Sequence, residues 1–237
     1  MANEDDDVVC LDESFFINDN YQLTTFTFGS EVLQLLCLQS ASTDYDLTGQ
    51  LVWPGAMLLN NYLSKNSDML QGCSVIELGS GVGITGIFCS RFCREVVLTD
   101  HNDEILKILN KNIELSVSSG SCNSCSGLVA EKLEWGNSDH INHIIQRHSR
   151  GFDLVLGADI CFQQSSVPLL FDTVEKLLRL KGEGQCKFIL AYVSRAKSMD
   201  TMVINEAVCH GMQISEVNGT RSVVGNLEGV IFEITLL

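Results

Sequence analysis

The chain of 237 residues is 45% apolar and carries a formal net charge of −15. That length and apolar share suffice for one α/β domain with a short extension. The negative charge disfavours a phosphate backbone as the main partner, so we expect no nucleic-acid substrate. No apolar run is long enough to span a membrane, so we expect no membrane partner.

The ten cysteines predict free thiols. Most of them sit inside apolar runs, as small buried residues do, and the acidic N-terminus lacks the apolar core of a secretion signal. We therefore expect a reducing compartment, the cytoplasm and also the nucleus. Cys122 and Cys125 have a metal-like spacing but stand alone in a Ser/Gly-rich loop. We favour a linker there and expect no metal site.

Three segments follow in chain order. Residues 1–14, with the acidic run at 4–7, are expected to be disordered. Residues 15–48 are predicted to form a β-hairpin extension, because weakly alternating segments flank Gly29 and Ser30. Residues 49–237 then form the main domain, where Pro54 suits the first turn of a helix that ends near Leu63.

Strand and helix patterns alternate through the main domain. Apolar runs predict strands at 73–78, 95–99, 128–134, 152–157 and 186–193, with helices at 84–92, 103–117, 138–148 and 166–180. A further helix at 199–209 precedes strands near 212–217 and 228–236, which have only a polar loop between them and must pair antiparallel. The pattern predicts an α/β fold, a doubly wound, Rossmann-like seven-stranded sheet with an antiparallel last strand.

The most informative stretch is residues 75–86. It reads as a buried strand, a glycine-rich turn and a helix start, and Asp100 closes the next apolar run. Such a turn lets backbone N–H groups and a helix N-terminus approach a ligand. A carboxylate at the end of the second strand can bind both ribose hydroxyls of a nucleoside. The pattern therefore indicates a cofactor that contains adenosine.

Two cofactors compete for this turn. Gly81, Gly83 and Gly86 match the dinucleotide spacing, which would indicate NAD. Glu77, two residues before Gly79, would repel a pyrophosphate, whereas the sulfonium and ammonium groups of S-adenosylmethionine tolerate a carboxylate. We favour S-adenosylmethionine, and the expected antiparallel last strand supports the same choice. A tight turn without any ligand is the third alternative.

Further motifs accompany the turn: Gly49-x-x-Val52-Trp53-Pro54-Gly55-Ala56, Leu98-Thr99-Asp100, Asn112, Leu133-Glu134-Trp135-Gly136 and Asp159-x-x-Phe162. With the loop Glu77–Gly83, they resemble the methyltransferase-like protein-lysine methyltransferase family, whose members have the class I, seven-strand fold. The resemblance covers roughly residues 20–237, and residues 49–237 would be the methyltransferase domain. The glycine loop alone is generic, whereas the tryptophan and Asp-x-x-Phe motifs are more specific.

The resemblance implies a set of cofactor-binding residues. Asp100 would bind the ribose, Trp135 would lie against the adenine, and Trp53 would cover the cofactor near the active site. Asn112 is equally compatible with a cofactor-side role and with an ordinary place late in its helix. The methionine moiety and its surroundings would be held by Glu77, Gly79, Ser80, Gly81, Gly83 and Ala158.

The resemblance also implies two catalytic residues, Asp159 and Phe162, after the fourth strand of the main domain. Asp159 would accept a hydrogen bond from the target amine, and its alternative is a helix N-cap. Phe162 lacks the hydroxyl of a tyrosine, but its ring can still steady a cation. His101 is expected on the surface. For Arg195, a place near the substrate and a solvated one both remain open.

The resemblance implies methyl transfer to a lysine of a soluble protein, with S-adenosylhomocysteine as the product, and we expect the enzyme to be a monomer. No long insertion is available as a lid, which favours an open site that admits a protein side chain. A small-molecule methyltransferase of the same fold and a non-catalytic cofactor-binding scaffold are the alternatives.

Overall fold

The structure is a computed structural model that describes residues 21–39, 45–118, 127–182 and 184–237. The predictions for residues 1–14 and for the Cys122 and Cys125 pair lie outside the described residues. The predicted hairpin is confirmed, because β1 (Gln22–Phe28) and β2 (Glu31–Cys37) pair antiparallel around Gly29 and Ser30. Among the described helices, none is both long enough and apolar enough to cross a bilayer.

The central sheet has the strand order β5-β4-β3-β6-β7-β10-β8. Neighbours from β5 to β7 run parallel, whereas β10 is antiparallel to both β7 and β8 and lies between them. This arrangement confirms the predicted antiparallel last strand. The strands are β3 (Ser74–Leu78), β4 (Glu95–Asp100), β5 (Gly127–Lys132), β6 (Leu154–Ala158), β7 (Lys187–Val193), β8 (Met212–Glu216) and β10 (Leu227–Leu236).

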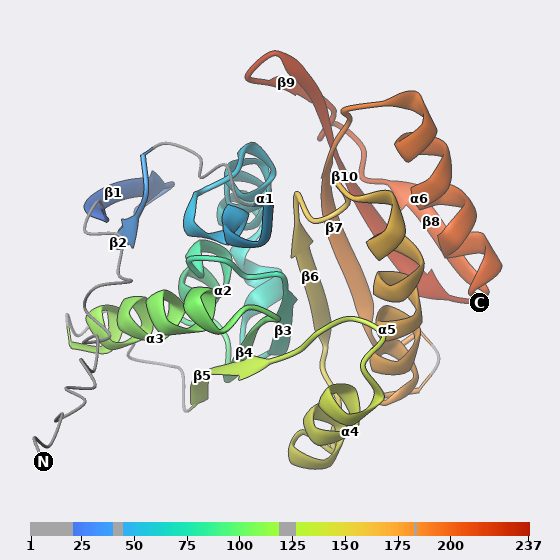
Figure 1. The fold of residues 1–237 in the computed structure, drawn as a ribbon, viewed down its shortest axis with the longest axis horizontal. Coiled ribbons are helices and arrows are strands. Elements are labelled where there is room, and N and C mark those ends of the chain that lie inside the picture. The colour runs from blue at the N-terminus through green and yellow to red at the C-terminus, as the bar shows by residue number, and fades with distance from the viewer. Residues whose placement is uncertain (1–20, 40–44, 119–126, 183) are drawn as a thin grey trace, which may run out of the picture.

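One further strand was not predicted. β9 (Ser222–Val224) lies in the segment expected to be a polar loop, and it pairs antiparallel with the start of β10. Three mostly exposed residues give no alternating apolar pattern, so the sequence carries no signal for it. The β9–β10 hairpin projects beyond the rest of the sheet (Figure 1).

Helices cover both faces of the sheet (Figure 1). Adjacent strand residues point to opposite faces, so Val75 packs in one core and Ile76 in the other. The first core also holds the hairpin and α1 (Pro54–Lys65), α2 (Ile84–Cys89) and α3 (Asp103–Ser118). The second holds α4 (Ser138–Arg147), α5 (Val167–Arg179) and α6 (Lys197–Cys209). Short 3-10 helices η2 (Tyr45–Gln50), η3 (Ser67–Leu70) and η4 (Gln164–Ser166) join these elements.

Several element ends lie one to three residues from their predicted positions, and α2 and β5 show why. The α2 helix ends at Cys89 rather than at residue 92, because the chain turns there toward β4. The β5 strand ends at Lys132 rather than at residue 134. Leu133 N still donates to Asp100 O of β4 at 2.9 Å, whereas Glu134 lies past the strand, and both residues line a cavity. In both places the apolar pattern continues past the end of the regular hydrogen bonding, so periodicity alone misplaces the boundary.

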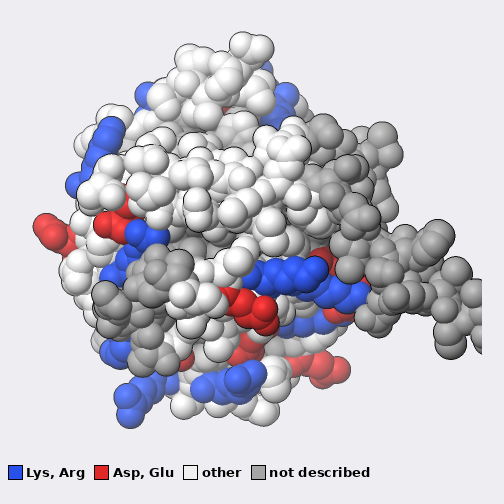
Figure 2. Space-filling view, turned by 90° about the vertical axis from the view of Figure 1, so that its left-hand side faces the viewer, with Lys and Arg blue, Asp and Glu red and all other residues white. Residues whose placement is uncertain are grey.

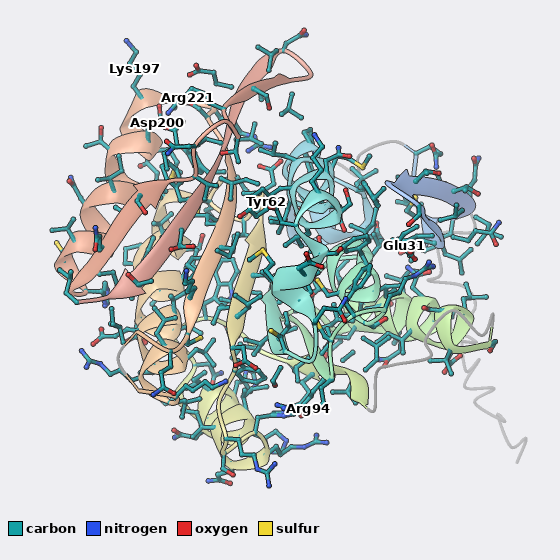
Figure 3. The ribbon with its side chains drawn as sticks, turned by 180° about the vertical axis from the view of Figure 1, so that it is seen from behind. Glu31, Tyr62, Arg94, Lys197, Asp200 and Arg221 are labelled. Carbon is teal, nitrogen blue, oxygen red and sulfur yellow. The ribbon has the colours of Figure 1, made fainter. Side chains whose placement is uncertain are left out.

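The hairpin is attached to the domain through Asn112 of α3. The Asn112 side chain is buried, and its Oδ1 accepts a hydrogen bond from Leu36 N at 2.7 Å. Its Nδ2 donates to Leu36 O at 3.0 Å and to Val82 O at 2.9 Å. An ion pair between Arg91 and Glu31, the latter labelled in Figure 3, adds a second attachment. Asn112 therefore joins the hairpin to the glycine loop, which neither of its two predicted roles anticipated.

The net charge of −15 is not concentrated on the face that carries the hairpin. Figure 2 shows basic and acidic side chains next to one another there, beside a broad uncharged area. Among the described residues in this view, the acidic side chains form no continuous patch.

Candidate active site

The glycine loop that follows β3 packs closely against η2. Gly81 has a φ of +53°, and a Cβ at this position would lie 2.7 Å from the carbonyl oxygen of Gly49. A side chain would therefore be both conformationally strained and too close to backbone. This contact explains why the glycine of the motif at 49–56 and the glycine loop occur together. The loop and η2 form one wall of a cavity.

Asp100 ends β4 and is held against this loop. Its Oδ2 accepts a hydrogen bond from Gly81 N at 3.2 Å, and its Oδ1 accepts one from Asn102 N at 3.1 Å. The residue is buried, yet it lines the cavity. Because β3 and β4 are parallel neighbours, their carboxyl ends meet at one edge of the sheet, as the sequence suggested.

Glu77 lies at the floor of the same cavity. Its Oε2 accepts a hydrogen bond from Gly86 N in α2 at 2.9 Å. Burial raises the pKa of the Glu77 carboxyl to about 7, because the charged form loses its hydration. Ser80 and Thr99 donate to the Glu77 carbonyl oxygen and tie the ends of β3 and β4 together. A positively charged ligand group would favour the ionised form of Glu77.

A cavity of about 260 Å³ opens at the carboxyl edge of the sheet. Ten of the predicted site residues line it: Trp53, Glu77, Gly79, Ser80, Gly81, Asp100, Trp135, Ala158, Asp159 and Phe162. Gly83 is the exception among the predicted set. It occupies the N-cap position of α2, where a Cβ would lie 2.4 Å from a methyl carbon of Leu109.

Asp159, after β6, connects three segments of the chain. Its Oδ2 accepts a hydrogen bond from Gly55 N in the first turn of α1 at 3.2 Å, and its Oδ1 pairs with the Arg195 guanidinium. Its backbone N–H donates to Ala191 O of β7 at 2.9 Å. Asp159 is also the only non-glycine residue with positive φ, +59°, in the described part of the chain. It therefore caps α1 in space, rather than a helix of its own as the alternative prediction had it.

Aromatic side chains frame the cavity. Trp53 precedes α1, and its Nε1 donates to Thr48 O at 2.8 Å, which fixes the plane of the indole. Trp135 is half-buried next to Gly79. The Phe162 side chain lies at the mouth, and the residue is 46% exposed. The cavity thus has Glu77, Asp100 and the Trp135 indole near the glycine loop, and Trp53 and Phe162 on the segments that meet at Asp159.

Comparison with known sequences shows the family to which the chain belongs. A family model described as lysine methyltransferase matches residues 34–206. The chain belongs to the lysine methyltransferase family. It is 30% identical over 158 residues to protein N-lysine methyltransferase METTL21A of Mus musculus, which covers 65% of each chain. It is 35% identical over 126 residues to EEF1A lysine methyltransferase 3 of Xenopus tropicalis, which covers 53% of this chain and 51% of that protein.

The alignments with curated relatives span about half to two thirds of the relatives' own lengths. Among solved structures, the chain is similar in fold to magnesium protoporphyrin IX methyltransferase (ChlM) from Synechocystis PCC 6803 with bound SAM. The TM-score is 0.53 at 11% identity, covering 84% of this chain and 86% of that chain. At this identity the likeness concerns the fold.

Sequence patterns do not indicate every residue of this site. Gly55 stands out in the sequence only as a member of a motif, yet its N–H donates to Asp159. The sequence is compatible with two places for Arg195, and in the structure it contacts Asp159 and Trp53. Leu169 of α5 lines the cavity without any signal beyond helical periodicity. His101, expected on the surface, is exposed and also lies at the rim.

Proposed function

We propose that this chain transfers a methyl group from S-adenosylmethionine to a lysine side chain of a soluble protein. The observation that carries the proposal is one cavity whose two ends are lined by different kinds of residue. One end offers Glu77, Asp100 and the glycine loop, and the other offers Trp53, Asp159 and Phe162. Membership of the lysine methyltransferase family and the names of the relatives support the same function.

The residues at the first end suit S-adenosylmethionine. Glu77 is a buried carboxyl with a pKa of about 7, and a sulfonium or ammonium group nearby stabilises its charged form. Asp100 would hold the ribose hydroxyls and Trp135 the adenine, with Ser80 and Ala158 in the surrounding wall. A pyrophosphate would place negative charge beside both carboxylates, which argues against a dinucleotide. When bound, the cofactor supplies a methyl group on positively charged sulfur, and S-adenosylhomocysteine is left after transfer.

The second end would receive the acceptor amine. A lysine amine has an ordinary pKa of about 10.4, so it must lose its proton before it can act as a nucleophile. Desolvation between Trp53 and Phe162 favours the neutral amine. Asp159 accepts hydrogen bonds from Gly55 and Arg195, but a carboxylate has about four lone-pair directions and can accept another from the amine. The main contribution of these residues would be to orient the amine.

EEF1A is the first acceptor to test, because the Xenopus tropicalis relative is named for it. We further propose that the enzyme acts as a monomer in the cytoplasm and nucleus. The cysteines in the described residues are all free, which fits a reducing compartment.

Two measurements test the proposal in sequence. Calorimetry should show binding of S-adenosylmethionine and S-adenosylhomocysteine in the micromolar range and none of NAD. Methyl-labelled S-adenosylmethionine should then label purified EEF1A or another protein of a soluble eukaryotic extract. Label that appears only in the small-molecule fraction would instead identify a small-molecule methyltransferase. Cofactor binding without transfer of label to any molecule would indicate a non-catalytic scaffold that binds the cofactor.

A further inference from the structure

Arg195 joins Asp159 and Trp53, two of the three residues at the acceptor end of the cavity. It follows β7, and its guanidinium donates to Oδ1 of Asp159 and to Val193 O at 3.3 Å. The guanidinium carbon also lies 5.8 Å from the centre of the Trp53 ring, a distance at which a cation is attracted to an indole face. A single side chain thus contacts a carboxylate and an aromatic ring that come from two other segments.

The Asp159 carboxylate needs such a partner. Its side chain is only 1% exposed, and a buried carboxylate without a partner is strongly destabilised. The Arg195 side chain is 31% exposed, so one side of the guanidinium keeps its contact with water while the other meets Asp159. Arg195 also remains charged at any physiological pH. The pair therefore fixes the orientation of the Asp159 carboxylate.

Arg195 contacts residues that line the cavity without lining it itself. Asp159 and Trp53 line the cavity, whereas Arg195 is absent from its lining in the described part of the chain. We propose that Arg195 is a positioning residue for methyl transfer, which holds the Asp159 carboxylate and the Trp53 indole in place around the acceptor amine. This inference rests on the proposed lysine methyltransferase function. Arg195 would orient the residues at the acceptor end, whereas Glu77 and Asp100 would bind the cofactor at the other end.

Three variants separate the possible roles of Arg195. Arg195→Met keeps much of the side-chain volume but removes the charge, and Arg195→Lys keeps the charge but loses the planar fork of donors. Arg221→Met is the matched control. Arg221, labelled in Figure 3, is 49% exposed on the segment before β9, pairs with Glu216 and Glu228, and does not line the cavity. Thermal unfolding of each variant checks that the chain still folds.

The first readout reports on Trp53 without any acceptor. The chain has two tryptophans, so Trp135→Phe leaves Trp53 as the only indole fluorophore. In this background, Arg195→Met should raise acrylamide quenching of Trp53 about twofold, because the guanidinium no longer covers one ring face. Arg195→Lys should give a smaller rise and Arg221→Met none. Equal quenching in all variants would overturn the inference.

The second readout is methyl transfer to EEF1A or to the extract protein that the parent chain labels. Arg195→Met should lower kcat about tenfold while the Kd for S-adenosylmethionine stays within about twofold, because only acceptor orientation is lost. Arg195→Lys should recover part of kcat. The double variant Arg195→Met/Asp159→Asn should have the same kcat as Asp159→Asn alone, because each substitution removes the same contact between Arg195 and Asp159.

The outcomes separate this inference from the proposed function. If the parent chain labels a protein and Arg195→Met keeps full kcat, Arg195 is not a positioning residue, although the function stands. A loss of cofactor affinity as large as the loss of kcat would also reject the inference, because it would indicate general damage to the site. If the parent chain labels no protein at all, the proposed function fails and the inference fails with it.

Discussion

The backbone N–H of Gly55 donates a hydrogen bond to Oδ2 of Asp159, a residue 104 positions later in the chain. A Cβ on Gly55 would lie 2.6 Å from the Asp159 Cβ and 2.9 Å from its backbone nitrogen. The first turn of α1 can therefore approach Asp159 only because position 55 has no side chain. This contact places the N-terminus of α1 and Trp53 beside the segment that follows β6.

Gly55→Ala should consequently disturb both stability and transfer. The clash is with backbone and a short side chain, so we expect a loss of about 1–3 kcal/mol in the free energy of unfolding. Methyl transfer should fall further than cofactor affinity, since Asp159 would have to move. Gly127→Ala at the start of β5 is the control, because the nearest atom to its Cβ would lie 3.8 Å away. Urea unfolding that gives equal stabilities for the two variants would contradict the close contact.

Asp100→Asn tests the cofactor end. The substitution preserves shape and an acceptor for Gly81 N–H but removes the charge that a ribose would meet. A hydrogen bond to a charged group contributes about 1.5–3 kcal/mol, so the Kd for S-adenosylmethionine should rise on the order of tenfold or more. Asp103→Asn removes an exposed carboxylate that pairs with Lys132, and its Kd should stay unchanged. Calorimetry that finds the same Kd for both variants would remove Asp100 from the ligand site.

Glu77 predicts a specific dependence of stability on pH. Its pKa is about 7 in the folded chain and 4.5 as an ordinary value. A carboxyl whose pKa is higher in the folded state holds its proton more tightly when folded. The stability linked to this proton is therefore complete below pH 4.5 and is lost as the pH rises to 7.

Glu77→Gln should remove this loss while keeping an acceptor for Gly86 N–H. Relative to the parent chain, its free energy of unfolding should increase by on the order of 3 kcal/mol between pH 4.5 and pH 8. Urea unfolding without cofactor at several pH values measures this difference. Glu104→Gln, which removes an exposed carboxyl of α3, should follow the parent chain. A constant difference between Glu77→Gln and the parent chain at every pH would show that Glu77 titrates normally.

Asn112→Ala tests the attachment of the hairpin. The variant loses three hydrogen bonds and leaves Leu36 N–H without its side-chain acceptor. We expect the free energy of unfolding to fall by about 2–4 kcal/mol. Asn110→Ala removes an exposed amide of the same helix and should change stability by less than about 0.5 kcal/mol. Similar urea midpoints for the two variants would mean that the buried amide contributes little.

Much of the fold was predictable from the chain. The local periodicity of apolar residues predicts the helices and strands. The antiparallel pairing of β8 and β10 follows from the lack of a helix between them. The glycine loop and Asp100 were also predictable, because strand ends in a parallel sheet meet at one edge. The short strand β9 was not, since three exposed residues have no distinguishing pattern.

The partners of the site residues depend on how distant segments pack. Asp159 was expected at the carboxyl edge, but its contacts with Gly55 and Arg195 join positions 104 and 36 residues away. Asn112 meets Leu36 across 76 residues, which no local period could indicate. Residue spacing and side-chain chemistry are properties of a short stretch of chain. The pairing of Asp159 with Arg195 and Gly55 depends on the packing of β6 beside β7 and of α1 against the ends of these strands.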